Sequence, residues 1–439
     1  KGAPEAVLNL SLLSEGDKKT VNDCLISFAK EGLRVLGVGM IDFEGNDFPK
    51  TQQEFKINFL GLLGFYDPPK KNIAHVFKQL YDAGIQLKII TGDNLITTSA
   101  IAKQAHIRGY ENAISSTELL QLSEDEFDKA VIKNSLFTRM FPELKLKVIE
   151  SLKRQNQIVG MTGDGVNDGP ALKAANIGIA MGKRGSEIAK EASSLILTDD
   201  DFGKMIDAVA MGRKIYTNLK KAIQYIISIH IPIILTVALP LILGWLSPSL
   251  FTPVHVIFLE LIMGPTCSIV YENEPLEKNS MLERPRLMTN TFFNLKELTV
   301  SIFQGLAITA GTLFIYQIGV RKGYDEDTTR SLVFTTLIFS NLLLTLVNRS
   351  FYFSVWSTLK NRNVLLRIMV ISTLALLTMI LCVPAFSSFF KMASLNGMQI
   401  SWTIAVAFLS VSWFEVYKLR KRRKQRLMEL NPVSYAKMV

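Results

Sequence analysis

The sequence has few residues of the kinds that build covalent or metal-held frameworks. Its 439 residues include only three cysteines and four histidines. Cys24, Cys267 and Cys382 are widely separated, so they indicate neither a disulfide framework nor a zinc site. The histidines show no metal-ligand spacing either. These scarcities argue against a fold held together by disulfides or by structural zinc.

Charge is scarce in the second half of the chain. The composition is 48% apolar with a mean hydropathy of +0.24, which is high for a soluble protein. Residues before 222 carry ordinary mixed charge, whereas long stretches after it carry almost none. A helix that spans a membrane needs about 20 apolar residues. We therefore predict a soluble half joined to a membrane half, with six spans near 223–245, 251–271, 297–320, 331–348, 364–386 and 400–417.

Positive charge lies at the ends of these predicted spans. The net charge is +10, and much of it comes from a basic tail. Cytoplasmic loops carry such an excess of lysine and arginine. We expect a multi-pass integral protein of the plasma membrane, with the lipid bilayer as a partner, cytoplasmic soluble domains and no nucleic-acid partner. The basic residues are Lys220, Lys221, Lys278, Arg284, Arg286, Arg349, Lys360 and Arg362 at the joins, then Lys418, Arg420, Lys421, Arg422, Arg423, Lys424 and Arg426.

The most informative stretch is 157–182, in the soluble half. Its apolar run at 158–161 is typical of a buried parallel strand, and a turn with two glycines follows. Asp164, Asn167 and Asp168 then lie at the carboxyl end of that strand, where open α/β sheets bind ligands. Hard oxygen ligands of this kind suit Mg²⁺. The stretch therefore predicts a magnesium-dependent site.

The same stretch carries a family resemblance. Thr-Gly-Asp-Gly-Val-Asn-Asp, followed by Pro-Ala-Leu-Lys, resembles the hinge signature of P-type ATPases. These are ion pumps that pass through an aspartyl-phosphate. The resemblance implies an α/β, haloacid-dehalogenase-like (Rossmann-like) phosphorylation domain, ATP as substrate and Mg²⁺ on Asp164. It also implies that Asp164 and Asp168 form the fourth motif of that superfamily, with Asn167 between them.

Two further positions fit the same superfamily. Thr91 ends one predicted strand as Asp164 ends another, so both face one predicted phosphate site. The Thr91 hydroxyl suits a hydrogen bond to a phosphoryl oxygen, and Lys145 suits a positive charge beside it. By order and spacing they are similar to the second and third motifs. A solvated helix lysine is the alternative for Lys145.

The first 58 residues resemble the end of an α+β nucleotide-binding domain. Lys1-Gly-Ala-Pro-Glu is similar to a motif whose lysine lies beside ATP. Arg34, at the start of a predicted strand, occupies the place of an arginine that contacts ATP phosphates. A surface arginine at a strand edge is an equally good interpretation. The predicted nucleotide contacts are Lys1, Gly2, Arg34, Thr91, Gly92 and Asp93.

These patterns predict four parts of the chain. Strands alternating with helices indicate a parallel sheet. Within it, Leu60–Phe65 is predicted as a buried strand and 110–135 as a surface insertion. The parts are a nucleotide-domain remnant at 1–58, a phosphorylation domain at 59–211, a basic helical stalk at 212–222, and a membrane domain with six helices and a basic tail at 223–439.

The nucleophile that the resemblance implies is not in this sequence. Asp-Lys-Thr-Gly-Thr, which carries the phosphorylated aspartate of the family, does not occur among these 439 residues. The chain also begins with Lys1 and not with methionine. We therefore expect a fragment whose upstream part supplies the nucleophile as a partner, and which is inactive alone.

The predicted spans contain candidates for a transported cation. Glu260 is a carboxylate inside the second span, and such groups mark ion pathways by default. Pro232 and Pro265 free the backbone carbonyls of Ser228 and Leu261. The other candidates are His230 and, more weakly, Asn341 and Glu415; each has a structural alternative, as a helix-packing contact.

Six spans after the hinge resemble the P2, calcium-pump-like group. The resemblance makes Ca²⁺ the leading cation. However, His230, Ile233, Met263 and Gly264 occupy positions where calcium pumps of the family carry Asn, Glu, Thr and Asp. One carboxylate beside a histidine suits a single divalent ion or a proton about as well. Two other hypotheses stay open: a membrane-anchored phosphatase of the same superfamily, and a non-catalytic membrane scaffold.

Overall fold

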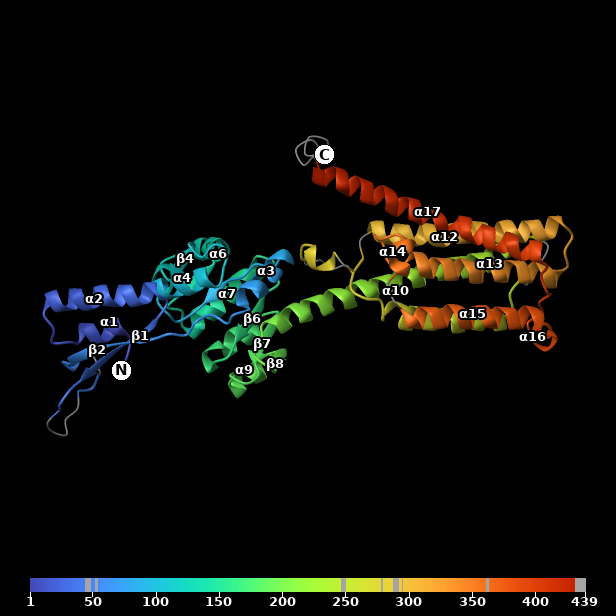
Figure 1. Ribbon diagram of the computed structural model, residues 1–439. Helices are drawn as coiled ribbons and strands as arrows, with labels where there is room; N and C mark the ends of the chain where they lie inside the picture. Colours follow the sequence, from blue (N-terminus) through green and yellow to red (C-terminus); the bar gives the residue numbers. More distant parts are fainter. Residues whose placement is uncertain are drawn as a thin grey trace. The chain divides into compact units, whose positions relative to one another are not determined.

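The computed structural model describes residues 1–43, 49–51, 54–245, 250–277, 279–286, 292–293, 295–360 and 363–430. The chain divides into two compact units (Figure 1). The first comprises Lys1–Val209 with Met281–Met288, and the second Ala210–Ser280 with Thr289–Val439. Lys278 and Arg362, predicted to mark the ends of spans, lie outside the described residues, as do the side chains of Cys267, Lys424 and Arg426.

The first unit begins with two helices and an antiparallel pair of strands. β1 pairs with β2 from Arg34 opposite Phe65 to Met40 opposite Asn58. β2 thus pairs across the domain boundary predicted at residue 58. The predicted burial of Leu60–Phe65 is wrong, since Leu60, Leu63 and Phe65 are 60%, 45% and 49% exposed. The elements are α1 (Pro4–Asn9), α2 (Glu15–Lys30), β1 (Arg34–Met40) and β2 (Asn58–Phe65).

A parallel sheet of three strands follows, in the order β3-β5-β4. Leu136 in the central strand lies opposite Ile89 on one side and Ala113 on the other. β4 belongs to the stretch predicted as a surface insertion. That prediction is wrong for β4, because its backbone pairs with the sheet. The elements are α3 (Ile73–Asp82), β3 (Ile89–Ile90), α4 (Leu95–Gln104), β4 (Ala113–Ser115), α5 (Ser116–Leu119), α6 (Glu124–Lys133) and β5 (Leu136–Thr138).

A second parallel sheet has the order β6-β7-β8. Pro142 stands in the first turn of α7, where a missing N–H costs nothing, and Ser186 caps α9 by accepting a bond from the Ala189 N–H. Phe137 from the β3-β5-β4 sheet and Met161 from the β6-β7-β8 sheet belong to one buried core, so the two parallel sheets share it. The elements are α7 (Pro142–Arg154), β6 (Gly160–Gly163), η2 (Val166–Asp168), α8 (Gly169–Ala174), β7 (Ile177–Met181), α9 (Glu187–Ala192) and β8 (Leu195–Leu197).

Lys88, directly before β3, makes the stability of this unit depend on pH. Its ammonium donates to the carbonyls of Ile132 and Asn134 at 3.0 and 2.6 Å. Burial lowers the pKa of Lys88 from 10.5 to about 8. Between these values the unfolded chain binds the proton more readily than the folded chain. The contribution of Lys88 to the free energy of unfolding therefore rises with pH from about 8 to about 10.5.

We expect Lys88→Met to flatten that rise. The measurement is thermal unfolding of the whole protein at a series of pH values, compared between the variant and the wild type. Lys78→Met, at an exposed position on α3, is the control and should leave the pH dependence unchanged. An identical slope for wild type and Lys88→Met between pH 8 and 10.5 would contradict the assignment.

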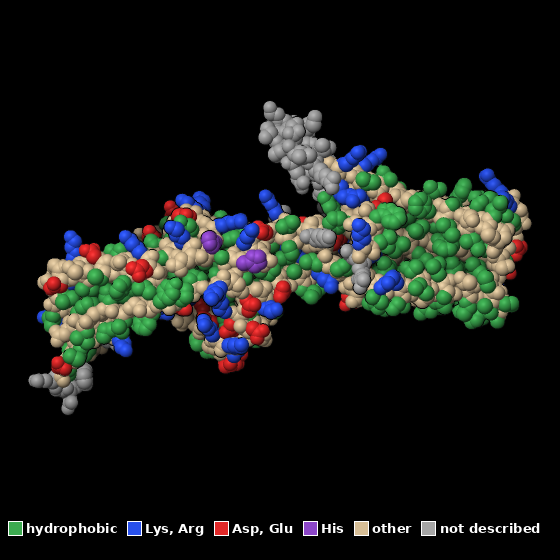
Figure 2. Space-filling view, viewed as in Figure 1, with side chains coloured by type: hydrophobic (Ala, Val, Ile, Leu, Met, Phe, Trp, Pro, Cys, Tyr) green, Lys and Arg blue, Asp and Glu red, His purple; other side chains and the backbone are tan. Residues whose placement is uncertain are grey.

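Within the described part of the chain, the second unit is a bundle of six helices long and apolar enough to cross a membrane, which confirms the predicted number of spans. Figure 2 shows hydrophobic side chains covering the visible face of this bundle. α13 is the most enclosed of these helices, with 83% of its apolar stretch buried among its neighbours. The six are α10 (Gly203–Ile242), α11 (Pro253–Pro265) with its continuation η3 (Thr266–Tyr271), α12 (Leu295–Arg321), α13 (Glu326–Val347), α15 (Val364–Cys382) and α17 (Gly397–Leu430).

Prolines interrupt these helices less than the sequence predicts. α10 is continuous through Pro232 and Pro240, and it includes the predicted stalk at 212–222. At Gly264-Pro265 the helix changes its winding and does not end, because α11 continues as the π-helical turns of η3. Short elements complete the unit: η4 (Ser280–Leu282), α14 (Val355–Leu359) and α16 (Pro384–Phe389).

Candidate functional site

Asp168 and Lys145 form the centre of the candidate phosphate site. The Lys145 ammonium donates to Asp168 Oδ1 at 2.7 Å, and both side chains are largely buried, with 13% and 12% exposed. Asp168 also accepts the Gly165 N–H at 3.4 Å through Oδ2. Lys145 comes from α7 and Asp168 from η2, so the ion pair joins two elements far apart in sequence. This contact disfavours the interpretation of Lys145 as a solvated helix lysine.

Asp164 lies beside this pair with its carboxylate open to solvent. It directly follows β6, and its backbone carbonyl, not its side chain, accepts the Ser186 N–H at 2.8 Å. Asn167 is likewise exposed. Gly163 is required here, because a Cβ at that position would come within 2.6 Å of Asp168 Cβ. The glycine therefore lets the Asp168 side chain pack against the end of the strand.

Thr91 organises a second polar group at the carboxyl end of β3. Its hydroxyl contacts Asp93 Oδ2 at 3.3 Å and accepts the Asp93 N–H at 3.1 Å. Its backbone is held on both sides, by Phe137 and Met140. Gly92, which lies between Thr91 and Asp93, is exposed. The half-buried hydroxyl is thus fixed at the end of the strand, as expected of a phosphate contact.

The predicted nucleotide residues adjoin this second group. Arg34 Nε lies 3.8 Å from Asp93 Oδ1, and both side chains are substantially exposed. Gly2 pairs with Gly37 of β1 through two backbone hydrogen bonds of 3.1 and 3.0 Å, which places the exposed Lys1 beside the strand that carries Arg34. The structure therefore brings Arg34, Thr91 and Asp93 together. Their contact with ATP stays a prediction.

No hydrogen bond or ion pair among the described residues joins the Thr91 group to the Lys145–Asp168 group. What they share is the core beneath them. Ile90 of β3 and Met140 pack on the same buried cluster as Leu144 of α7 and Met161 of β6. Both polar groups thus lie at carboxyl ends of parallel strands that rest on one core.

The donor set at Asp164 suits Mg²⁺ better than a softer metal. Its exposed carboxylate is the free hard ligand, while Asp168 is paired with Lys145. Among the described residues no group of three or more His, Cys, Asp or Glu side chains is placed to hold a metal. A site with one carboxylate fits Mg²⁺, which binds through one or two carboxylates and keeps waters and phosphate as its other ligands.

In the membrane unit the structure brings Glu260 and His230 together. His230 Nε2 lies 3.0 Å from Glu260 Oε1, and His230 Nδ1 lies 2.8 Å from the Ile226 carbonyl. The two side chains are 40% and 47% exposed. An ionisable pair inside spans is costly unless it serves a pathway or a partner. The pair joins α10 to α11 next to the change in winding at Pro265.

The two carbonyl candidates lie differently. Ser228 is fully buried, and its hydroxyl contacts the Ser301 carbonyl and Gln304 Oε1 on α12, so its side chain packs away from solvent. Leu261 is 64% exposed on α11, next to Glu260 in sequence. Only their backbone carbonyls remain candidate ligands. Of the weaker candidates, Glu415 binds Lys418 at 2.5 Å.

Asn341 is a stronger candidate in the structure than in the sequence. It is buried in α13, its amide group donates to Met263 Sδ on α11 at 3.4 Å, and its Oδ1 has no hydrogen-bond partner among the residues that the structure describes. A buried carbonyl oxygen without a partner is unfavourable unless something else binds it. The sequence indicated Asn341 as a candidate, since an amide inside a span is rare. The direction in which its side chain points depends on helix packing, which the sequence pattern does not give. Met263 carried no polar signal and was missed as a contact.

Two family models match the chain. Residues 29–176 match "haloacid dehalogenase-like hydrolase" and residues 248–420 match "Cation transporting ATPase, C-terminus". The first range includes Thr91, Lys145, Asp164 and Asp168, and the second includes Glu260. The soluble and membrane halves therefore match families of different kinds, in the order that the sequence predicts.

Relatives among curated proteins cover both halves. The chain is 31% identical over 445 residues to "Calcium-transporting ATPase 1" of Saccharomyces cerevisiae, covering 96% of this chain and 46% of that protein. It is 29% identical over 430 residues to "Calcium-transporting ATPase 1" of Bacillus cereus, covering 94% and 48%. It is 34% identical over 301 residues to "Calcium-transporting ATPase type 2C member 2" of Homo sapiens, covering 67% and 31%. The chain spans about half the length, or less, of these relatives.

Proposed function

The chain belongs to the P-type cation-transporting ATPases, in the calcium-pump-like group, and we propose that the whole protein uses ATP to move a cation across a membrane. The observation that carries the proposal is the contact between Glu260 and His230 inside the spans, in a chain whose other unit bears the Lys145–Asp168 pair. Transport needs both an intramembrane ion site and a phosphate site. A phosphatase needs only the second.

We propose that an upstream part of the same protein completes the phosphate site. β3 and β6 are edge strands of their sheets among the described residues, and they end directly before Thr91 and Asp164. An added parallel strand at either edge would end at the same place. Such a strand, carrying an aspartate, would take the γ-phosphoryl group of ATP on its carboxylate as ADP leaves.

The residues of this chain then have distinct roles in the proposal. Thr91 donates a hydrogen bond to a phosphoryl oxygen, and Lys145, held by Asp168, faces the same oxygens with its positive charge. Asp164 and the upstream aspartate hold Mg²⁺, which offsets negative charge on the phosphoryl group when it is bound. Arg34 and Lys1 hold the nucleotide, and Gly2, Gly92 and Asp93 line its site. Asn167 is exposed next to Asp168 and belongs to the same loop as Asp164.

Ca²⁺ is the leading cation in this proposal, because the relatives are calcium-transporting ATPases by name. The ligands offered here are the Glu260 carboxylate, His230, the Asn341 oxygen, and the backbone carbonyls of Ser228 and Leu261. One carboxylate in this set suits a single divalent ion. We propose the plasma membrane as the location of the protein. The lysine and arginine at the ends of the spans support a cytoplasmic position for its soluble unit.

An ATPase assay of the full-length protein tests the proposal. Purified protein is assayed across Ca²⁺, Mn²⁺, Mg²⁺, Na⁺, K⁺ and a range of pH. We expect one of these cations to stimulate ATP hydrolysis, with Ca²⁺ as the leading candidate. We also expect acid-stable labelling of the protein from ATP. Hydrolysis that no cation stimulates, in protein that does form the phosphoenzyme, would favour a membrane-anchored phosphatase.

A further inference from the structure

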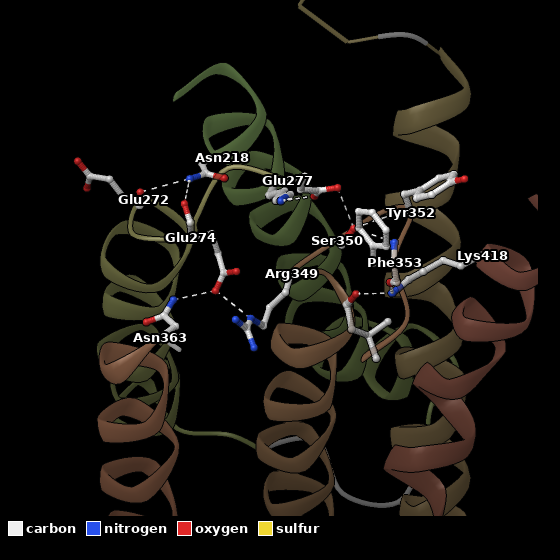
Figure 3. Close-up of polar contacts among 12 residues, drawn as sticks. Asn218, Glu272, Glu274, Glu277, Arg349, Ser350, Tyr352, Phe353, Asn363 and Lys418 are labelled. Atoms are coloured by element: carbon white, nitrogen blue, oxygen red, sulfur yellow. Dashed lines mark hydrogen bonds and ion pairs between the residues drawn. The ribbon is translucent and has the colours of Figure 1, made fainter. Parts of the chain in front are cut away.

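The segment that follows η3 holds a buried carboxylate with two partners on other helices. Glu274 Oε1 lies 2.8 Å from Arg349 Nε, and the two side chains are only 4% and 1% exposed. The same oxygen accepts a hydrogen bond of 2.7 Å from Asn363 Nδ2 (Figure 3). Arg349 lies two residues beyond the end of α13, and Asn363 caps the start of α15. Glu274 therefore fastens this segment to two helices of the bundle.

The same segment is tied to α10 from the other side. Asn218 Nδ2 donates to the backbone carbonyls of Glu274 and Glu272 at 2.8 and 3.3 Å. Lys221, only 2% exposed, lies 2.6 Å from Glu277. Glu277 also accepts the Ser350 hydroxyl at 3.0 Å. Residues 272–277 are thus held between α10 and the ends of α13 and α15, and we call them the bridging segment.

The bridging segment is continuous with the helix that carries Glu260. α11 runs through η3 directly into it, so a displacement of the segment acts on α11. Lys221 lies about 14 Å before His230 along α10, at 1.5 Å rise per residue. The two partners of the intramembrane pair, His230 and Glu260, are therefore on the two elements that the bridging segment joins. These contacts therefore connect α10 and the ends of α13 and α15 with the segment that continues α11.

Stability alone does not account for this cluster. A buried ion pair is often no more stabilising than apolar side chains of similar volume, because desolvation offsets the attraction. What buried polar contacts do provide is a defined register between elements. The cluster has several such contacts directed at one short segment, and two residues of α10, Asn218 and Lys221, supply three of them.

We propose that Glu274 is a positioning residue that couples α10 to α11, so that the bridging segment sets the relative placement of His230 and Glu260. The proposal rests on the proposed function of this chain as part of a cation pump. Arg349 and Asn363 provide the fixed side of the coupling, and Asn218 and Lys221 the side on α10. Loss of the coupling leaves ATP chemistry in place and reduces the number of cations moved per ATP.

The test uses the full-length protein reconstituted in vesicles, with Ca²⁺ as the transported probe. Glu274→Met together with Arg349→Met removes both buried charges, so neither is left unpaired. We expect this variant to form phosphoenzyme from ATP at the wild-type level and to move about tenfold fewer Ca²⁺ ions per ATP, which is within the usual range of coupling between sites. Asn218→Ala, which cuts the tie from α10 without removing a charge, should lower the same ratio.

Thr236→Val together with Thr312→Val is the matched control. It removes a buried polar contact of 2.9 Å between α10 and α12 that does not involve the bridging segment, and it should leave the transport ratio unchanged. A normal ratio in both Glu274→Met/Arg349→Met and Asn218→Ala would overturn the coupling role. If the double variant does not fold, Asn218→Ala alone decides the question. Failure of the wild-type protein to form phosphoenzyme would instead refute the proposed function, on which the coupling depends.

Discussion

Asp164→Asn is expected to reduce Mg²⁺-dependent phosphoenzyme formation in the full-length protein to background. The loss of one electrostatic contact to a transition state commonly costs about a hundred- to a thousandfold in rate. Asparagine keeps the size of the side chain and removes the negative charge that would hold Mg²⁺. The fold should be preserved, because the Asp164 carbonyl, not its carboxylate, makes the contact with Ser186. The measurement is acid-stable labelling from radioactive ATP at a series of Mg²⁺ concentrations.

Asp199→Asn is the control for this experiment. Asp199 is an exposed aspartate that follows β8 in the same parallel sheet as β6, so the substitution makes the same charge change near the end of another strand. Its labelling should equal that of the wild type. Normal labelling of Asp164→Asn at limiting Mg²⁺ would refute the metal role of Asp164.

Glu260→Gln is expected to abolish cation-stimulated ATPase activity while ATP binding persists. The predicted loss of stimulation is about a hundredfold at a fixed cation concentration, equivalent to roughly 2.7 kcal/mol at 1.36 kcal/mol per factor of ten. Glutamine is nearly isosteric and preserves a polar contact with His230, so the change tests charge and not packing. The measurement is ATPase activity against cation concentration, together with nucleotide binding by the same preparation.

Glu272→Gln is a matched control for that variant. Glu272 also follows the helix that carries Glu260, but its side chain is exposed and only its backbone carbonyl takes part in a contact among the described residues (Figure 3). Its cation stimulation should be normal. Unchanged stimulation at unchanged cation affinity in Glu260→Gln would show that Glu260 is a structural carboxyl.

Some features of the site follow from short stretches of sequence. The turn around Asp164 was predictable because glycines and a proline restrict the local backbone in known ways. The helices that begin at Pro142 and near Pro170 follow for the same reason. The family resemblance drawn from this stretch is confirmed by the matches at 29–176 and 248–420. The assignments of individual site residues and of the domain boundaries stay predictions.

Other features were beyond sequence patterns. Leu60–Phe65 has the composition of a buried strand, but its burial depends on which layers cover it. β4 lies in a polar stretch whose pairing with β5 is a contact between segments some 20 residues apart, and polarity says nothing about such pairing. The unpartnered oxygen of Asn341 and the contacts of Glu274 likewise depend on which helices are neighbours.

The sequence by itself determined the six spans, the phosphate-site turn and the family, because run length, hydropathy and turn chemistry are local properties of the chain. Only the tertiary structure decided that His230 meets Glu260, that Ser228 turns its hydroxyl toward α12, and that Glu274 joins three helices. Each of these depends on the rotational phase and packing of whole helices. Small changes in either would separate the same side chains without altering any local pattern.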